Sequence, residues 1–344
     1  MGRRRIYVAY TGGTIGMTRS AVGYKPEADS LLEMFECDPV FRAEGMPELT
    51  VKQYEPLLDS SNMVPADWAR MARDLVANAK GHDGFLVVHG TDTMAYTASA
   101  LSFMLEGLDR PVLLTGSQIP LEEPRSDAHN NLVTSLMLLE RYADRLHEVC
   151  VCFGGRLLRG NRTKKIDAED FAAFDSPNLP HLGRMGIDFD LRWDLIRQVD
   201  PKAGPLTVHA FDSASVAAFR LFPGLQARYL ESLFSAGIDG LVLECYGAGN
   251  APHNNKDFLR VLREATDAGV VIVDVPQPIH GCADLSLYET GRALLDVGVV
   301  GGFDMTPEAS LAKLSYLFAR GHDPAEVRQL VQQNLRGELT PPEA

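Results

Sequence analysis

The stretch IYVAYTGGT, residues 6–14, joins an apolar run to a glycine-rich turn and a threonine. Ile6–Tyr10 carries no charged residue, as expected of a strand that helices cover on both faces of a parallel sheet. Gly12 and Gly13 allow a sharp bend because neither has a Cβ atom. The stretch therefore predicts the first strand of an α/β fold, with a turn at its carboxyl end that presents Thr14.

Short β-rich runs recur through the first half of the chain, several of them apolar almost without interruption, and helical patterns separate them. The expected strands are Val51–Leu58, Gly84–His89, Pro111–Thr115 and Val149–Phe153, and the expected helices begin at Asp67, Thr93 and Asp127. This alternation predicts an N-terminal domain with a mainly parallel sheet flanked by helices.

The organisation changes near residue 178. Prolines 177, 180, 201 and 205 interrupt a stretch without clear periodicity, and shorter strand and helix patterns resume after it. We therefore expect a catalytic domain over residues 1–178, a linker over 179–205 and a smaller C-terminal α/β domain over 206–344. Strands are expected in the last part at Val208–Ala210, Gly240–Glu244 and Val270–Val275.

Composition and charge exclude several classes of protein. The net charge of −13 argues against a nucleic-acid partner, which usually requires a basic surface. No segment approaches the roughly 18 apolar residues of a membrane span, so we expect no membrane partner. The five cysteines, an odd number without a matching ligand cluster, indicate a reducing cytoplasmic location and no metal site.

Polar residues follow each predicted strand of the first domain, where ligands bind in an open parallel sheet. They are Thr14; Asp59, Ser60 and Ser61; Gly90, Thr91 and Asp92; Ser117; and the pair Lys164 and Lys165. These strand ends predict a small polar site that is rich in hydroxyl groups.

The turn before Thr14 does not match a nucleotide-binding motif. Its GGxxG spacing fits neither the dinucleotide pattern GxGxxG nor the phosphate-binding pattern GxxxxGK. Two alternatives remain open from the residues alone. Thr14 is either a nucleophile, which needs a neighbouring group to take its proton, or a helix cap or core threonine.

The motif HGTDT, residues 89–93, has the same ambiguity. Thr91 or Asp92 suits the N-cap of the helix that follows. Alternatively, Lys165 activates the Thr91 hydroxyl, while Asp92 holds that lysine or a substrate ammonium.

Taken together, these motifs resemble the L-asparaginases, and in particular the cytoplasmic bacterial type I branch of the asparaginase/glutaminase family. The stretches that carry the resemblance are YVAYTGGTIGM (7–17), DSS (59–61), HGTDTMAY (89–96), TGSQ (115–118), RGNRT (159–163), YGAGNAP (246–252) and NLRGEL (334–339). They extend over nearly the whole chain.

The resemblance implies hydrolysis of the side-chain amide of L-asparagine without a metal or cofactor. It implies that Thr14 is the primary nucleophile, that Tyr24 closes over the site, and that Thr91, Lys165 and Asp92 form a triad. An acyl-enzyme on Thr14 and direct attack by water both remain open.

It also implies how the substrate is held and how the protein assembles. Asp59 and Ser60 hold the α-amino and α-carboxylate groups, Ser61 and Ser117 line the wall, and the Gly90 N–H helps to stabilise the oxyanion. Homodimers or homotetramers are implied, with Asn250 a candidate contribution to the partner's site; a plain turn residue is the alternative.

The chain departs from the family pattern at a second, allosteric asparagine site. Glu244, Lys164 and Pro278 stand where some type I members have arginine, threonine and cysteine. An acid at the first position reverses the charge offered to a carboxylate, so we expect this site to be absent or differently tuned. Lys164 also competes with Lys165 for the triad role, and the spacing from Arg162 favours Lys165.

Three rival functions are weighed against asparagine hydrolysis. A glutaminase-leaning enzyme would differ in pocket size alone. A tRNA-dependent amidotransferase subunit would carry a further N-terminal domain, whereas this sequence opens at the first predicted strand. A sensor that had lost catalysis would lack Thr14, Thr91, Asp92 or the lysine, and all of these residues are present.

Overall fold

A computed structural model describes residues 2–20, 23–26, 29–211, 213–286 and 289–340. The chain divides into two compact units, Met1–Val208 and His209–Ala344, each of which is described by itself. Within the described residues, no helix has the length and apolar character that crossing a membrane requires.

The first unit is built on an eight-stranded sheet with the order β13-β12-β9-β8-β7-β5-β1-β4. The parallel strands are β1 (Arg5–Gly12), β4 (Glu48–Leu58), β5 (Gly84–Val88), β7 (Val112–Thr115) and β8 (Val149–Phe153). All five strands predicted for this domain are present. The α/β class with a mainly parallel sheet is therefore confirmed.

Three short antiparallel strands extend this sheet beyond β8: β9 (Arg156–Arg159), β12 (Gly183–Met185) and β13 (Phe189–Leu191). Two of them lie in 179–205, the segment expected to be a linker, which instead contributes to the sheet of the first unit. The sequence hides β12 and β13 because charged residues such as Arg184 and Asp190 interrupt any apolar run. Their backbone groups are satisfied by pairing of β12 with β9 and of β13 with β12.

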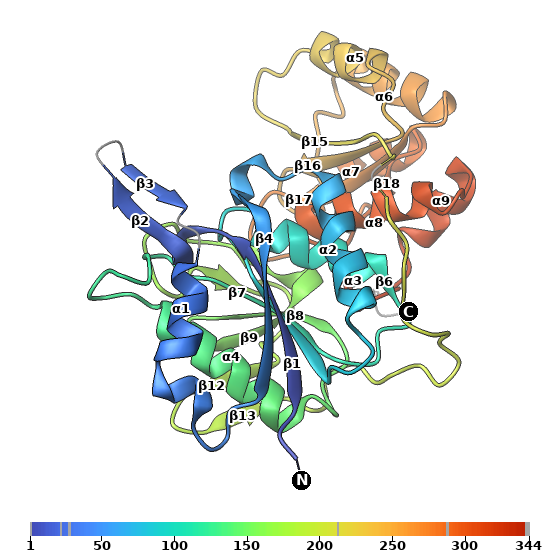
Figure 1. The fold of residues 1–344 in the computed structure, drawn as a ribbon. Coiled ribbons are helices and arrows are strands. Elements are labelled where there is room, and N and C mark those ends of the chain that lie inside the picture. Colours follow the sequence, from blue (N-terminus) through green and yellow to red (C-terminus); the bar gives the residue numbers. More distant parts are fainter. Residues whose placement is uncertain (1, 21–22, 27–28, 212, 287–288, 341–344) are drawn as a thin grey trace. The chain divides into compact units, whose positions relative to one another are not determined.

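Helices cover both faces of this sheet (Figure 1). On one face, α1 (Ser30–Cys37) and α4 (Ala128–Tyr142) pack with Ile6, Val8 and Tyr10 in a buried hydrophobic cluster. On the other face lie α2 (Pro65–Ala77) and α3 (Met94–Met104), and the Tyr7 hydroxyl donates to Asp74 of α2 at 2.8 Å. Alternate residues of β1 thus face opposite layers, which explains its unbroken apolar run.

Short strand pairs complete the first unit. They are β2 (Met17–Ser20) with β3 (Gly23–Pro26), β6 (Leu105–Glu106) with β14 (Thr207–Val208), and β10 (Lys164–Lys165) with β11 (Phe174–Asp175).

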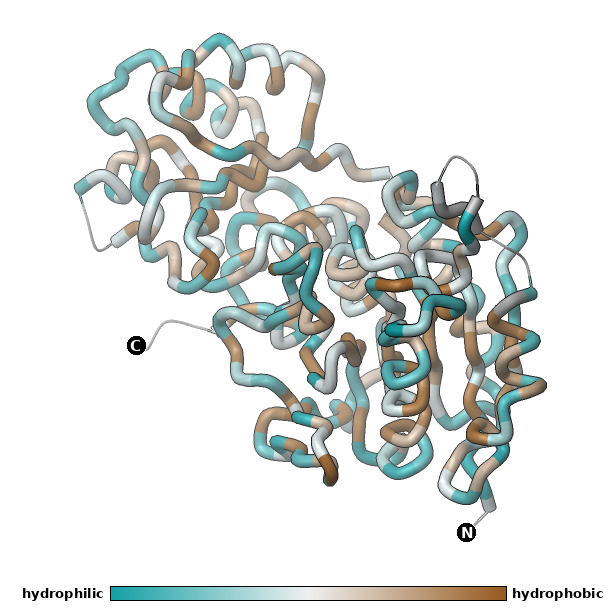
Figure 2. The backbone as a smooth tube through the Cα atoms, turned by 90° about the vertical axis from the view of Figure 1, so that its left-hand side faces the viewer, coloured by the Kyte–Doolittle hydropathy of each residue, from teal (hydrophilic) through white to brown (hydrophobic). Residues whose placement is uncertain are grey.

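Figure 2 shows hydrophobic residues concentrated along the central strands and hydrophilic residues along the outer loops.

The second unit has a four-stranded parallel sheet in the order β15-β16-β17-β18. Its strands are β15 (Val216–Arg220), β16 (Gly240–Cys245), β17 (Val271–Pro276) and β18 (Val300–Gly301), and its helices are α5 (Ala227–Ser235), α6 (Lys256–Asp267), α7 (Glu289–Asp296), α8 (Pro307–Ala319) and α9 (Pro324–Leu330). The sequence missed β15, an edge strand in which Ala218 and Arg220 are exposed. The strand expected at Val208–Ala210 corresponds in part to β14 (Thr207–Val208), which belongs to the first unit.

Strand order places a candidate site in the first unit. The chain passes from β1 to β4 on one side and then to β5 on the other side of β1, so the order reverses beside β1. Ligands of open α/β sheets bind at such a reversal, beyond the carboxyl ends of the strands. The turns after β1, β4 and β5 therefore border the expected site.

A buried carboxyl group lies in the sheet of the second unit. Asp274 on β17 is fully buried, and neither of its carboxyl oxygens has a hydrogen-bond partner among the described residues. Burial raises the pKa of Asp274 to about 8, although the neighbouring Cys245 thiol opposes the shift. The folded protein therefore holds this group protonated at neutral pH.

This pKa shift predicts how stability depends on pH. A free aspartate ionises near pH 4, so folding takes up a proton at Asp274 between about pH 4 and pH 8, and stability falls as pH rises through that window. The unfolding free energy of wild type should fall by about 3 kcal/mol relative to Asp274→Asn between pH 5 and pH 8. Urea unfolding measures this difference, Asp257→Asn on the surface of α6 is the control, and equal pH slopes for all three proteins would contradict it.

Candidate active site

The turns after β1, β4 and β5 meet through backbone contacts. A Cβ atom on Gly13 would lie 2.5 Å from the N and Cα atoms of Gly90, and one on Gly90 would lie 2.4 Å from the Ser60 hydroxyl oxygen. Gly13 also has a φ of 97°, which disfavours any side chain. Glycine at both positions therefore allows three strand ends to approach closely.

The side chain of Lys165 contacts the turn that follows β5. Its Nζ donates to the Thr91 hydroxyl oxygen at 2.9 Å and to the Asp92 carboxylate at 2.8 Å. The lysine stands on the short strand β10, whose backbone pairs Lys165 with Phe174 of β11. Thr91 is 5% exposed, whereas the Asp92 side chain is 66% exposed, so the carboxylate of this cluster is open to solvent and its threonine is buried.

Neither Thr91 nor Asp92 caps the following helix, the structural alternative that the sequence left open. The N-cap of α3 is Thr93, whose hydroxyl donates to the Ser60 carbonyl oxygen at 2.8 Å rather than to the helix. The hydroxyl of Thr91 is therefore available to Lys165, and Thr93 joins the turns after β4 and β5.

His89 is the residue immediately before Gly90 in the turn after β5, and it is fully buried. Its Nδ1 lies 2.7 Å from the Gly90 carbonyl oxygen and its Nε2 lies 2.9 Å from the Thr97 hydroxyl oxygen. Burial lowers the pKa of His89 to about 4, although the contact with the Gly90 carbonyl opposes the shift. The ring is therefore neutral near pH 7.

Thr14 begins a short 3-10 turn, Thr14–Gly16, and is half-buried beside Gly13. The cap position of this turn belongs to Gly13, so Thr14 is not its N-cap. The backbone of Tyr24 lies in β3 opposite Arg19 of β2, and the Tyr24 side chain lies outside the part of the chain that the structure describes.

The other predicted binding residues follow β4 and β7. Asp59 is exposed, and its carboxylate accepts from the Ser61 N–H at 3.0 Å and from the Asn62 amide at 3.3 Å. Ser60 is 3% exposed. The hydroxyl of Ser117, which is buried, donates to the Ile119 carbonyl oxygen at 2.7 Å.

Asn250, Glu244 and Pro278 belong to the second unit. Asn250 closes a tight turn: its N–H donates to the Tyr246 carbonyl oxygen at 2.7 Å, and its own carbonyl accepts from the Tyr246 N–H at 2.9 Å. The Glu244 carboxylate pairs with Arg220 at 3.2 Å, and Pro278 is exposed in the loop after β17. Asn250 thus has the turn geometry that its sequence neighbours indicate.

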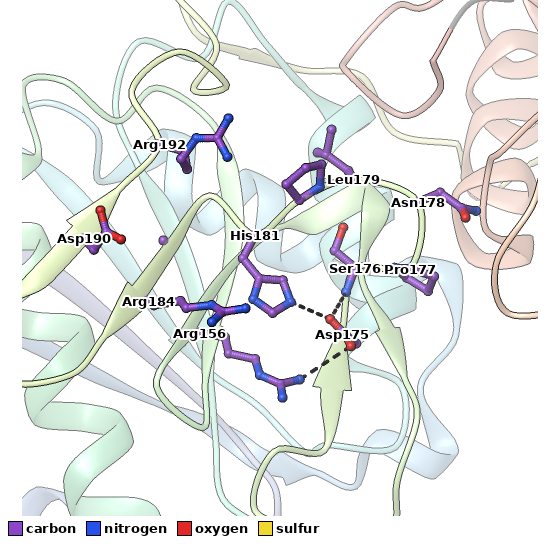
Figure 3. A pocket seen from close by; sticks show the side chains of 12 residues that line it. Arg156, Asp175, Ser176, Pro177, Asn178, Leu179, His181, Arg184, Asp190 and Arg192 are labelled. Carbon is purple, nitrogen blue, oxygen red and sulfur yellow. Dashed lines mark hydrogen bonds and ion pairs between the residues drawn. The ribbon is translucent and has the colours of Figure 1, made fainter.

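A pocket of about 800 Å³ opens elsewhere in the first unit, and none of the predicted site residues lines it (Figure 3). Asp175 accepts from His181 Nε2 at 2.6 Å and lies 3.6 Å from the Arg156 guanidinium. Burial disfavours ionisation of Asp175, but the bonds from His181 and the Ser176 N–H hold its pKa below the usual value. The Asp175 carboxylate in this pocket therefore already has hydrogen-bond and ion-pair partners within the chain.

Two supporting residues were missed from the sequence. Asp127 accepts from the N–H groups of Gln118 and Ile119 at 3.0 and 3.2 Å and so orders the loop that carries Ser117. Its position at the start of a predicted helix was the available signal; Asp127 is the N-cap residue of α4, but its side chain makes no capping hydrogen bond to that helix. His89 was quoted only as part of a motif; its place immediately before Gly90 was the available signal.

The assembled groups suit proton transfer at a hydroxyl. A lysine amine in contact with the Thr91 hydroxyl is placed to exchange its proton, and Asp92 orients that amine. Among the residues that the structure describes, no group of three His, Cys, Asp or Glu side chains is arranged to hold a metal ion.

Comparison with protein families matches both units. Residues 5–197 match the model "Asparaginase, N-terminal", and residues 215–331 match the model "Glutaminase/Asparaginase C-terminal domain". The two matches together span most of the chain and leave only a short segment between them.

Individual proteins are similar over the full length. L-asparaginase 1 of Escherichia coli is 46% identical over 346 residues, which cover 99% of each chain. The 60 kDa lysophospholipase of Homo sapiens is 41% identical, over 98% of this chain and 62% of its own. The crystal structure of L-asparaginase I from Vibrio cholerae superposes with a TM-score of 0.91 at 42% identity, covering 98% of this chain and 100% of that one.

Proposed function

The chain belongs to the asparaginase family, and from this premise we propose that it hydrolyses the side-chain amide of L-asparagine to L-aspartate and ammonia. The observation that carries the proposal is the contact of Lys165 with Thr91 and Asp92 at the meeting point of three strand ends. Amide hydrolysis needs a nucleophile, a proton carrier and a stabilised oxyanion, and these turns supply groups of each kind.

In the first step, the Thr14 hydroxyl oxygen forms a bond to the amide carbon, and its proton passes to neighbouring groups of the site, which later deliver it to the leaving nitrogen. The carbonyl oxygen becomes negatively charged, and the backbone N–H groups of Gly90 and Thr91 stabilise it. Collapse of this intermediate breaks the C–N bond. The nitrogen takes up a proton and leaves as ammonia, so that an aspartyl ester remains on Thr14.

In the second step, water attacks the ester. The Thr91 hydroxyl and Lys165 carry the water's proton to the Thr14 oxygen, and L-aspartate is released. Lys165 rather than Lys164 takes this role, since its Nζ lies 2.9 Å from the Thr91 hydroxyl oxygen. Direct attack by water, with Thr14 positioning the carbonyl, uses the same Thr91 and Lys165 contacts.

Substrate recognition uses the charges at the rim of the site. The carboxylates of Asp59 and Asp92 accept the α-ammonium group, and the turn at Ser60 holds the α-carboxylate. Ser61 and Ser117 line the wall. Asp59 and Asp92 are both exposed, which supports their availability to a ligand.

Assembly and location follow from the same premise. We propose that the protein is a homodimer or homotetramer in the cytoplasm, that Tyr24 closes over the substrate, and that Asn250 extends toward the partner's site. All five cysteines are free, which agrees with a reducing compartment.

Ammonia release tests the proposed function. Wild type is expected to release ammonia from L-asparagine, and more slowly from L-glutamine, whereas Thr14→Ala should lose at least about 1,000-fold in kcat because the nucleophile is gone. Ser135→Ala is the control, because it removes a buried hydroxyl group on α4 that is not among the proposed site residues. Folded wild-type protein that releases ammonia from neither amide would overturn the proposal.

The rate is expected to rise hyperbolically with asparagine concentration. Glu244 offers a negative charge, already paired with Arg220 at 3.2 Å, where a second asparagine carboxylate would need a positive one. Steady-state rates over a wide range of asparagine concentration check this. A sigmoidal curve that becomes hyperbolic in Glu244→Ala or Lys164→Ala would contradict it.

A further inference from the structure

The hydrogen bonds around His89 assign its protons. A carbonyl oxygen only accepts, so the 2.7 Å contact with the Gly90 carbonyl requires a proton on Nδ1. The neutral ring then has a bare Nε2, which accepts from the Thr97 hydroxyl at 2.9 Å. The three groups form one directed chain, from the Thr97 hydroxyl through the His89 ring to the Gly90 carbonyl.

This chain fixes one peptide plane of the proposed site. The Gly90 carbonyl and the Thr91 N–H belong to the same planar trans peptide, so they point in opposite directions. Holding the carbonyl toward His89 therefore directs the Thr91 N–H away from the ring. Rotation of this peptide would lose the bond to His89 and would move the Thr91 hydroxyl that Lys165 contacts.

His89 is itself held in place. Its backbone N–H donates to the Thr115 carbonyl oxygen at 2.8 Å, and its own carbonyl oxygen lies 2.3 Å from where a Cβ atom on Gly116 would stand. Thr97, on α3, is fully buried like the ring. The helix α3 thus holds the Thr97 end of the chain of bonds, and the neighbouring strand β7 holds the backbone of His89.

We propose that His89 is a positioning residue for catalysis, acting with Thr97 through the Gly90–Thr91 peptide to hold the Thr91 N–H and hydroxyl toward the reacting amide. The role rests on the proposed hydrolysis. A preorganised N–H stabilises the oxyanion only in the transition state, so misplacing it lowers kcat with little change in substrate binding.

Replacement of the ring tests the role. His89→Leu should lower kcat about 100-fold, as expected when a catalytic group is displaced by about 1 Å, with KM changed by less than about threefold. His89→Asn puts an amide donor near the place of Nδ1 and should recover about tenfold of the lost kcat. His89→Gln puts its donor near Nε2 instead and should recover little.

Thr97 supplies a second pair of variants, which decides the matter if His89→Leu does not fold. Thr97→Val removes the donor to Nε2 and should lower kcat several-fold at unchanged KM, whereas Thr97→Ser keeps the hydroxyl and the rate. Ser135→Ala removes a buried hydroxyl donor to Asn131 on α4 and controls for a general loss of stability.

Nitrogen NMR gives a readout that does not depend on activity. In ¹⁵N-histidine protein at pH 7, the signals that disappear in His89→Asn should report a neutral ring with the proton on Nδ1. A proton on Nε2 would overturn the assignment.

The kinetic outcomes separate the two proposals. If wild type releases no ammonia, the proposed hydrolysis fails. If wild type is active and folded His89→Leu keeps its kcat, or His89→Asn recovers no more than His89→Gln, the positioning role fails while hydrolysis stands.

Discussion

Replacing Lys165 by methionine is expected to lower kcat for asparagine about 1,000-fold, the range that a general acid–base group contributes. Methionine keeps most of the side-chain volume but has no amine for the Thr91 hydroxyl, which Lys165 Nζ contacts at 2.9 Å. KM should change much less, because the rim carboxylates remain. Initial rates of ammonia release over a range of asparagine concentrations measure both constants.

Lys164→Met is the matched control. It removes the same charge one residue earlier on β10, whose backbone pairs Lys164 with Asp175 of β11. Its turnover should stay near the wild-type value. An inactive Lys164→Met beside a near-normal Lys165→Met would reverse the assignment of the triad lysine.

The second large effect is on stability, in the second unit. Lys313 on α8 and Glu338 are both completely buried and lie 2.5 Å apart. Burial disfavours the charged form of Glu338, but Lys313 and the backbone N–H of Leu335 hold its pKa below the usual value. Lys313→Met leaves that carboxylate buried without its cation and should reduce the unfolding free energy by about 3–5 kcal/mol.

Urea unfolding of the full chain measures this loss. Lys313→Met combined with Glu338→Leu should recover much of it, because removing both charges removes the unpaired one. Arg260→Met is the control: Arg260 makes exposed ion pairs with Glu231 and Glu264, and its replacement should have little effect. A Lys313→Met protein as stable as the control would show that the Lys313–Glu338 pair does not stabilise the fold.

Sequence patterns predicted the elements that bury apolar residues on both faces. β1, β5 and β8 carry unbroken apolar runs and were found, and Val149–Phe153 has the predicted bounds. β12 and β13 were missed because their charged residues lie at the edge of the sheet. β12 pairs with β9 and β13 pairs with β12, and local periodicity does not reveal these contacts.

For the site, the strand-end rule predicted the turns, and the structure shows which of them approach one another: those after β1, β4 and β5. Spacing alone did not decide whether Thr91 is a site residue or the N-cap of the following helix. In the structure the N-cap residue is Thr93. The role of His89 depends on a hydrogen bond to Thr97, eight positions along the chain, and on a proton position that no sequence pattern carries.

The close approach of Gly13 to Gly90 has a consequence for altering substrate range. Main chain lies against main chain there, so the spacing between the turns that carry Thr14 and Thr91 does not depend on any rotamer. A larger residue at either glycine would therefore push the two turns apart. Asparagine and glutamine differ by one methylene group, which a pocket distinguishes by about 1–3 kcal/mol. Variants that favour the longer amide should therefore be sought at Ser61 and Ser117, which we propose line the wall of the site.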